Sequence, residues 1–251
     1  MNYINHNDAF NISRVLTESG NIYGLKGDTD SHLMKNSEWG AVAYLSQSAY
    51  GFIGAGNTDI TINSKTMNNG GVSTSKADGN ALASVYAVTG YNNNNKEWND
   101  GGENASTTGN IYGIYDMSGG VWERTPAYVA NGNGSLKSYG ASISYNGNTM
   151  KTASTKYTTV YPHDGTGTMD DISNASHTAN TKIYGDGVLE TSTQGTGSKS
   201  WNGDYSTFPA TSSPFFIRGG RWDNGGSAGV FAFYRNYGHS IYSGGFRPVL
   251  V

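Results

Sequence analysis

The chain has 251 residues and a net charge of −3, long enough to form a hydrophobic core in one large domain or two small ones. Charged residues make up only 14% of the chain and aromatic residues 12%, which argues against a basic nucleic-acid binder and against charge-rich disorder. The sequence has no cysteine and no apolar run of membrane-spanning length, which excludes disulfides, thiolate metal sites and cysteine catalysis and argues against membrane insertion.

Two helices are predicted near the N-terminus, over residues 7–19 and 37–48, because apolar residues recur there at helical spacing after a capping residue. The second also places Glu38 in its first turn, where the helix dipole favours an acid. The candidate caps are Asn7 or Asp8 and then Asn36 or Ser37, and the apolar stripes are Phe10, Val15 and Leu16 and then Trp39, Val42, Ala43 and Leu45.

After residue 50 the pattern is less regular, and turn residues dominate it. The expected elements are a hairpin or long surface loop over 51–79, a helix or buried strand over 81–89, an Asn/Gly loop over 91–108, hairpins at Asn131-Gly132, Asn133-Gly134 and Asn146-Gly147, and a helix over 169–184. No repeat and no convincing linker divides the chain, so a single α+β domain over 1–251 is predicted. Residues 1–20 lack the apolar centre of a signal peptide, and 1–34 are interpreted as a lead-in, cut from a longer chain if the natural protein extends further.

The last 34 residues, 218–251, have the composition of a recognition surface. They combine Tyr, Ser, Asn and Gly with four of the chain's six arginines, and they contain no Lys, Glu, Gln or Met. Tyr gives rigid contact area, Ser and Asn give adaptable hydrogen bonds, and Arg or Trp can anchor a partner. The residues at the irregular positions can all be reached by altering only the adenines of an AAC codon, whereas the absent ones cannot.

Three segments resemble the formylglycine-generating-enzyme/sulfatase-modifying family. Residues 35–43 (KNSEWGAVA) resemble its T-E-A-E-W-E-Y-A-A helix, and residues 110–123 (NIYGIYDMSGGVWE) resemble its N-x-x-G-L-Y-D-M-x-G-N-V-W-E segment. Residues 218–222 (RGGRW), followed by Gly245-Phe246-Arg247, resemble its closing R-G-G-S-W … G-F-R. The resemblance implies a C-type-lectin-like fold, with short antiparallel strands, two or more helices and extensive loops.

The departures from that family concern its chemistry. Its oxidising enzymes use cysteines, which this chain lacks, and its sulfoxide-forming branch uses a histidine-rich iron site. No two of the five histidines lie within one helical turn of each other in the sequence; they are His6, His32, His163, His177 and His239. A metal-dependent oxidoreductase therefore remains an alternative, and convergence of two or three of these histidines would favour it.

The same fold has a non-catalytic branch, the variable proteins of diversity-generating retroelements, and the C-terminal segment resembles their frame closely. That resemblance makes Gly225, Ala228, Gly229, Phe231 and Phe233 fixed positions. It makes the following residues variable and ligand-binding: Arg221, Asp223, Asn224, Ser227, Tyr234, Arg235, Asn236, Tyr237, His239, Ser240, Tyr242 and Ser243. It implies a rigid scaffold whose exposed residues can change without disturbing the core.

Several residues have a structural alternative beside the functional one. Trp222, Phe231, Phe233 and Phe246 are expected in the core rather than on a ligand, and Arg247 is expected to pair with an acid or with carbonyl groups. No cofactor is expected except calcium, for which the family resemblance offers Glu123 as the acidic ligand. The alternative for Glu123 is a hydrogen bond or salt bridge inside the fold.

We therefore expect a binding protein rather than an enzyme. Its predicted partner is a protein or glycan on a cell, phage or host surface, which implies a cell-surface, extracellular or virion location. A structural adhesin or phage component is the other alternative, in which residues 234–242 form the contact of a symmetric oligomer. The sequence leaves the oligomeric state open.

Overall fold

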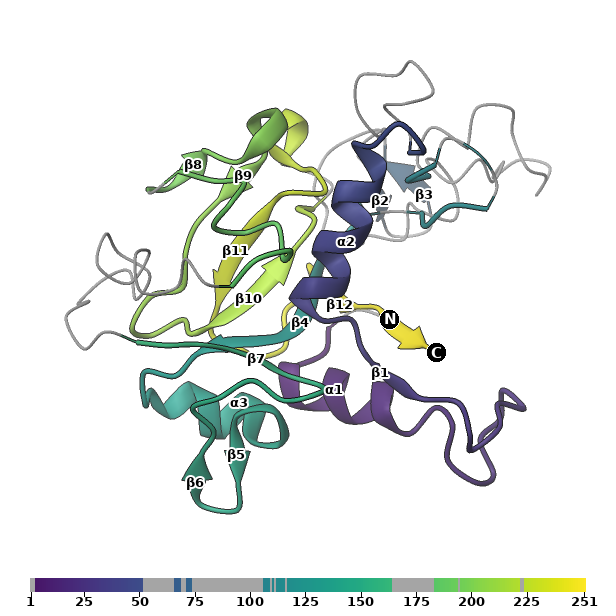
Figure 1. The fold of residues 1–251 in the computed structure, drawn as a ribbon, viewed down its shortest axis with the longest axis vertical. Helices are drawn as coiled ribbons and strands as arrows, with labels where there is room; N and C mark the ends of the chain where they lie inside the picture. The colour runs from purple at the N-terminus through teal and green to yellow at the C-terminus, as the bar shows by residue number, and fades with distance from the viewer. Residues whose placement is uncertain are drawn as a thin grey trace.

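The computed structural model describes residues 3–51, 66–68, 71–73, 106–108, 110, 112–115, 117–163, 183–193, 195–221 and 224–251. Within these residues the chain has three α-helices and many short strands, so the α+β prediction is confirmed (Figure 1). The elements in chain order are α1 (His6–Arg14), β1 (Ser31–Leu33), α2 (Asn36–Ser46), β2 (Thr66–Asn68), β3 (Gly71–Ser73), β4 (Trp122–Val129), α3 (Gly134–Ser144), β5 (Tyr145–Asn146), β6 (Thr149–Met150), β7 (Thr159–Tyr161), β8 (Gly197–Ser198), the 3₁₀ turn η4 (Trp201–Gly203), β9 (Tyr205–Ser206), β10 (Phe215–Arg218), the 3₁₀ turn η5 (Gly225–Ser227), β11 (Phe233–Asn236), β12 (Gly244–Phe246) and β13 (Pro248–Leu250).

The largest sheet runs in the order β12-β4-β10-β11-β9-β8, and β7 also pairs with β4. β4 is antiparallel to β10, and its other edge pairs in parallel with β12 over its first residues and with β7 over its last. All eight residues of β4 and all four of β10 are buried, because other parts of the chain cover both faces of these strands. The C-terminal strands β11 and β12 therefore flank the β4–β10 pair at the centre of the fold.

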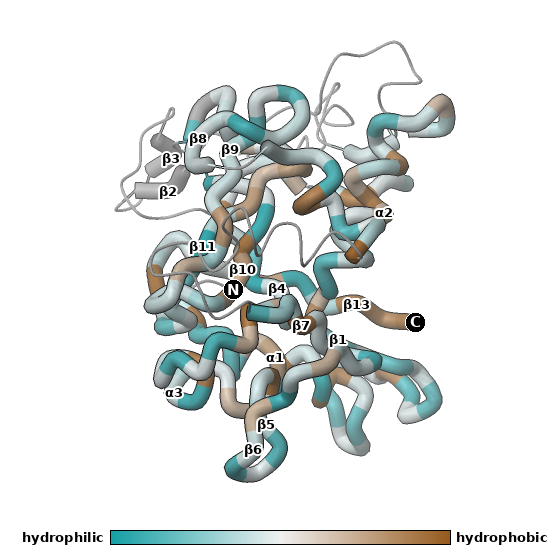
Figure 2. The backbone as a smooth tube through the Cα atoms, turned by 60° about the vertical axis from the view of Figure 1, so that its left-hand side comes forward, coloured by the Kyte–Doolittle hydropathy of each residue, from teal (hydrophilic) through white to brown (hydrophobic). Residues whose placement is uncertain are grey.

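Successive side chains of β10 point to opposite faces of the sheet and so belong to two hydrophobic layers. Phe215 packs with Phe10 of α1 and Leu136 of α3, so these helices cover one end of the first face. Phe216, on the opposite face, packs with Phe233 of β11 and with other buried side chains. Figure 2 shows an apolar stretch along β10 and a hydrophilic β5–β6 turn.

The first helix is shorter than predicted and buries a different face. Asn5, not Asn7 or Asp8, is its cap, since the Asn5 Oδ1 accepts a hydrogen bond of 2.8 Å from the backbone N–H of Asp8. The helix ends at Arg14, so Val15 and Leu16 lie beyond it and Val15 is exposed. The buried residues are His6, Ala9, Phe10 and Ser13. Phe10 is buried as predicted, but Val15 and Leu16 are not part of the helix, and two polar residues complete the buried face instead.

The bounds of the second helix agree with its prediction to within two residues at each end, but its N-cap is Lys35 rather than Asn36 or Ser37, and Leu45 is exposed. Its first turn is closed by Glu38, whose Oε2 accepts the backbone N–H of Lys35 at 2.9 Å. Trp39 is buried and donates its Nε1–H to the Val230 carbonyl at 2.6 Å. This contact ties α2 to the segment that precedes β11.

The third helix was not predicted, because Asn133-Gly134 was interpreted as a hairpin signal. Asn133 instead caps α3, accepting the N–H of Ser135 at 2.8 Å. Asn146-Gly147 does form the predicted hairpin, between β5 and β6, with Gly147 at φ +60°.

Other predictions fall partly outside the described residues. The hairpin expected over 51–79 contains the antiparallel pair β2–β3, but residues 52–65 and 74–79 lie outside. The same holds for residues 81–89, for 91–105 of the Asn/Gly loop and for 169–182 of the expected helix. The single-domain assignment stays a prediction. None of the helices in the described ranges has the length and apolar character that a membrane span requires.

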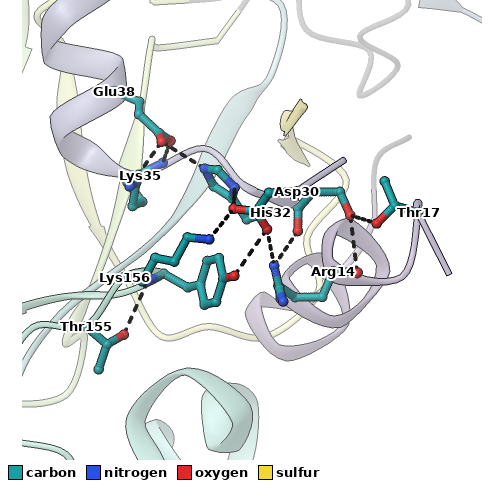
Figure 3. A network of polar contacts seen from close by, with 10 residues as sticks. Arg14, Thr17, Asp30, His32, Lys35, Glu38, Thr155 and Lys156 are labelled. Carbon is teal, nitrogen blue, oxygen red and sulfur yellow. Dashed lines mark hydrogen bonds and ion pairs between the residues drawn. The ribbon is translucent and has the colours of Figure 1, made fainter. Parts of the chain in front are cut away.

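A network of charged side chains joins α1, β1 and α2 (Figure 3). The Asp30 carboxylate lies 2.9 Å from Arg14 Nη1 and 3.0 Å from Lys156 Nζ. His32 continues the network, with its Nε2 2.8 Å from Glu38 Oε1. The network therefore fixes the N-terminal elements to each other at a point where β1 pairs with β13.

Asp30→Asn is expected to reduce the loss of stability in acid. Hydrogen bonds from Lys156, and then from Arg14 and Tyr157, hold the pKa of Asp30 well below its ordinary 3.8 despite the opposing effect of burial. Because the folded-state pKa is depressed, the stabilisation is complete above about pH 4 and is lost as the pH falls towards the lower folded-state value. The difference between the urea midpoints measured at about pH 6 and at about pH 3 should be smaller for the variant than for the wild type. The exposed Asp28→Asn should keep the wild-type response, and an unchanged acid response in Asp30→Asn would contradict this account.

Candidate functional site

The C-terminal segment begins with a buried arginine. Arg218 at the end of β10 is fully buried, and its guanidinium donates to the carbonyls of Asp186 at 2.8 Å and Gly187 at 3.2 Å. Gly219 and Gly220 follow with φ of +88° and +80°. A Cβ at Gly220 would lie 2.7 Å from Ala228. The R-G-G motif therefore has a steric reason, since only glycine combines this backbone with so close an approach.

A cluster of buried polar groups lies beneath that arginine. The Tyr161 hydroxyl donates to Asp186 Oδ2 and accepts from Asn36 Nδ2 at 3.1 Å, while Asp186 Oδ1 accepts the N–H of Val188 at 3.0 Å. Burial raises the pKa of Asp186 to about 7. These groups bond to one another inside the fold, so the cluster supports the frame and does not face a ligand.

The loop between β10 and β11 is closed by Asp204. This buried carboxylate accepts the N–H of Phe231 through Oδ2 at 2.8 Å. A Cβ at Gly229 would lie 2.0 Å from both carboxylate oxygens, so glycine at this position lets the loop backbone lie against Asp204. Ala228, Phe231 and Phe233 are buried. The residues expected to be fixed are therefore interior, with the side-chain environment of Gly225 outside the described set.

Three aromatic rings meet where the first face of the sheet continues past the helices. Tyr234 on β11 lies 5.8 Å, centroid to centroid, from Trp122 on β4, with the rings inclined by 29°. On its other side Tyr234 lies 5.8 Å from Tyr205 of β9. A cavity of about 380 Å³ opens here, lined by Trp122, Tyr205, Ile217, Arg221, Asn224, Tyr234, Asn236, Ile241 and Ser243.

A second hollow, of about 550 Å³, adjoins the first along β11. Its lining consists of Tyr234, Arg235, Asn236 and Tyr237 on one side and the turn Ala210, Thr211, Ser212 and Ser213 on the other. The two hollows share Tyr234 and Asn236. We call them together the β11 groove. Neither hollow has an Asp or Glu among its lining residues.

A buried arginine fixes the loop that follows β11. Arg124 of β4 is 1% exposed, and its Nη1 lies 2.5 Å from His6 Nδ1 and 3.1 Å from Asn236 Oδ1. Its Nη2 donates to the His239 carbonyl at 2.6 Å. Burial lowers the pKa of Arg124 to about 9, and burial together with Arg124 lowers the pKa of His6 well below 6.5. The neutral His6 can then accept from Arg124 while it donates through Nε2 to the Phe216 carbonyl, 3.2 Å away.

The structure brings seven of the twelve predicted contact residues to the β11 groove. They are Arg221, Asn224, Tyr234, Arg235, Asn236, Tyr237 and Ser243. Tyr237 and Tyr242 are 47% and 49% exposed, whereas Asn236 and Ser243 are largely buried. His239 is exposed, Ser240 is half-buried, and Ser227 lies outside the groove with its hydroxyl 3.0 Å from that of Ser198. Asp223 and Trp222 lie outside the described residues.

Glu123 forms an ion pair with another side chain of the fold. Its two carboxylate oxygens accept from Arg247, at 2.6 Å for Oε1 and 3.0 Å for Oε2. Arg247 also donates to the Tyr115 carbonyl at 3.1 Å, so this arginine pairs as expected. The salt-bridge alternative for Glu123 is thus the arrangement observed, and a calcium ion would have to displace Arg247.

Three of the described histidines have separate surroundings. His6 contacts Arg124, His32 contacts Glu38, and His239 lies on the surface near Tyr237. Across the described residues, no three side chains of His, Asp or Glu are grouped so that they could hold a metal ion. His177 lies outside this part of the chain.

Sequence reasoning missed the opposite walls of the groove. Trp122, Tyr205, Ile217 and the turn at 210–213 come from other strands and loops, and only their pairing in the sheet brings them to Tyr234. Sequence reasoning also missed Arg124. The available signal was an arginine directly before Thr125–Val129, a run without any other charge, because a buried cation must have partners.

Comparison with known proteins adds no relative. No known protein family matches the chain, and no curated protein is significantly similar to it in sequence.

Proposed function

We propose that this protein is a ligand-binding protein whose C-terminal segment displays exchangeable side chains on a rigid frame. The observation that carries the proposal is that residues 218–251 fall into two groups, one buried and one lining a groove. Positions expected to be fixed are buried and sterically constrained, whereas seven positions expected to vary line one groove. Substitution of groove residues can then change recognition at small cost to folding.

The proposal includes a C-type-lectin-like fold of the kind used by variable proteins of diversity-generating retroelements. The three motif segments and the glycine positions explained by close packing support it. The strands are mostly short, but the sheet departs from the expected antiparallel pattern, since β12 and β7 pair in parallel with β4 and β9 pairs in parallel with β11. The proposed partner is a protein or a glycan on a cell, phage or host surface, which places the protein at the cell surface, outside the cell or on a virion.

Simultaneous replacement of Tyr234, Tyr237 and Tyr242 by alanine is expected to abolish binding. Large aromatic side chains dominate contact energetics, so the combined loss should be about a hundredfold or more in affinity. Wild type and variant would be screened on a glycan array and on a panel of purified bacterial and phage surface proteins. Thermal unfolding of both proteins checks that the fold is kept.

The matched control replaces three exposed tyrosines outside the groove, Tyr23, Tyr112 and Tyr184, which are 65%, 88% and 75% exposed. This control should bind as the wild type does. Binding that survives replacement of Tyr234, Tyr237 and Tyr242 but is lost in the control would place the ligand elsewhere and overturn the proposal.

A further inference from the structure

Asn236 presents a fixed hydrogen-bond donor at the wall shared by the two hollows. Its side chain is largely buried, at 8% exposure, and its Oδ1 accepts from Arg124 Nη1 at 3.1 Å and from the Gly238 N–H at 2.7 Å. A carbonyl oxygen has two lone pairs, so these bonds use its full capacity and set the orientation of the amide. Among the described residues nothing accepts from the Asn236 Nδ2, which leaves its two N–H groups for a ligand.

The neighbouring Tyr234 ring contacts two other aromatic rings. Tyr234 lies between Trp122 and Tyr205, each 5.8 Å away, and with Ile217 these rings give the hollow an apolar side. The polar groups of Asn236 and Ser243 line the same hollow, as does Asn224. The hollow therefore combines an apolar aromatic side with several hydrogen-bonding groups.

We infer, on the basis of the proposed function, that the group seated against Tyr234 is a saccharide ring with an oxygen accepting a hydrogen bond from Asn236 Nδ2. A sugar ring has an apolar C–H face that packs on an aromatic ring and an edge of oxygens that accept hydrogen bonds. The hollow beside Tyr234, at about 380 Å³, lies within the size range of small-ligand sites, roughly 300–1,000 Å³.

An apolar side chain of a protein partner fits this hollow less well. It would cover the Nδ2 of Asn236 without offering an acceptor, and a buried donor left unpaired costs about 1–3 kcal/mol. A carboxylate would satisfy that donor but would leave the faces of Tyr234 and Trp122 against a charged group. A hydroxylated ring satisfies both requirements.

Arg124 acts as the positioning residue for this donor. It does not line either hollow, but it holds the Asn236 Oδ1, and its second nitrogen holds the His239 carbonyl in the loop beyond. Because Arg124 is itself buried, the amide is oriented before any ligand arrives, which reduces the entropy lost on binding.

Asn236→Asp tests the assignment with little change in shape. The carboxylate keeps both bonds that Oδ1 accepts and gains an ion pair with Arg124, but it replaces the Nδ2 donor by an acceptor. On an array of immobilised oligosaccharides, the wild type is expected to bind a defined set of glycans, and Asn236→Asp is expected to lose about tenfold to a hundredfold in affinity. Its thermal midpoint should not fall.

Asn148→Asp is the matched control. Asn148 lies in the β5–β6 turn, near the opposite end of the molecule from β8 and β9 in Figure 1, and its Oδ1 likewise accepts from a cation, Lys137 Nζ, at 3.1 Å. The same chemical change there should leave glycan binding unaltered.

Three outcomes would overturn the saccharide assignment. One is a wild type that binds no glycan on the array, and another is glycan binding that Asn236→Asp leaves unchanged. The third is binding only to a surface protein, lost on replacing Tyr234, Tyr237 and Tyr242; that result would keep the proposed function and remove only the ligand class. Binding to a surface protein that is unchanged when the three tyrosines are replaced would remove both the ligand class and the proposed function.

Discussion

An Arg124→Met variant is expected to lose about 3 kcal/mol of its free energy of unfolding. Methionine fills much of the volume of the arginine side chain but donates no hydrogen bond. The acceptors that lose this donor are the buried His6 Nδ1 and the partly buried His239 carbonyl, while Asn236 Oδ1 keeps only the Gly238 N–H. Each buried acceptor without a donor costs about 1–3 kcal/mol, and release of the guanidinium from its own desolvation offsets part of that total.

Urea denaturation measures this loss, and hydrogen exchange locates it. Faster exchange is expected at Gly238 and the residues after it, because Arg124 ties this loop to β4. Arg14→Met is the control, since Arg14 is partly exposed and bonds to Asp30 at 2.9 Å; it should cost only about 1 kcal/mol. If Arg124→Met has the same urea midpoint as the wild type, the free-energy cost of burying the arginine cation equals the stabilisation from its hydrogen bonds, which contradicts the expected loss.

The sequence predicts those parts of the fold whose causes are local. The α2 helix follows from its apolar spacing and from Glu38, which lies three residues beyond the N-cap and reaches back to the Lys35 N–H. The α1 helix is recognised, but its buried face is not, because His6 and Ser13 find partners that lie far away or in the backbone of the helix itself. Asn133-Gly134 shows the limit of turn signals, since the same dipeptide can close a hairpin or start a helix.

The same distinction, between features with local causes and features that depend on long-range pairing, applies to the candidate site. Residues 218–251 carry a recognisable frame, so one wall of the groove is predicted from the sequence. The other wall depends on β4 and β9 lying beside β10 and β11, and strand pairing over such separations leaves no local pattern. Asn236 and Ser243 were expected as contacts and are largely buried, because loop and strand geometry decides which side chains point inward.

Gly229→Ala is expected to prevent folding or to cost about 4 kcal/mol, more than most small-to-large changes. The added Cβ would lie 2.0 Å from both oxygens of the Asp204 carboxylate, which is 1% exposed and has little room to move. Displacing that carboxylate would also break its bond to the Phe231 N–H. Gly229 does not have a positive φ, so alanine is compatible with the backbone and the penalty comes from the clash alone.

Gly226→Ala, three residues earlier, gives the matched control. A Cβ at Gly226 would meet nothing within 4 Å, so its thermal midpoint should stay close to that of the wild type. The double variant Asp204→Ala/Gly229→Ala identifies the cause. With the carboxylate removed, the alanine at 229 should add little to the cost of Asp204→Ala alone, giving a coupling of about 2 kcal/mol or more. Additive losses would instead mean that glycine is required at 229 for a reason other than the approach of Asp204, and the steric account of the frame would fail there.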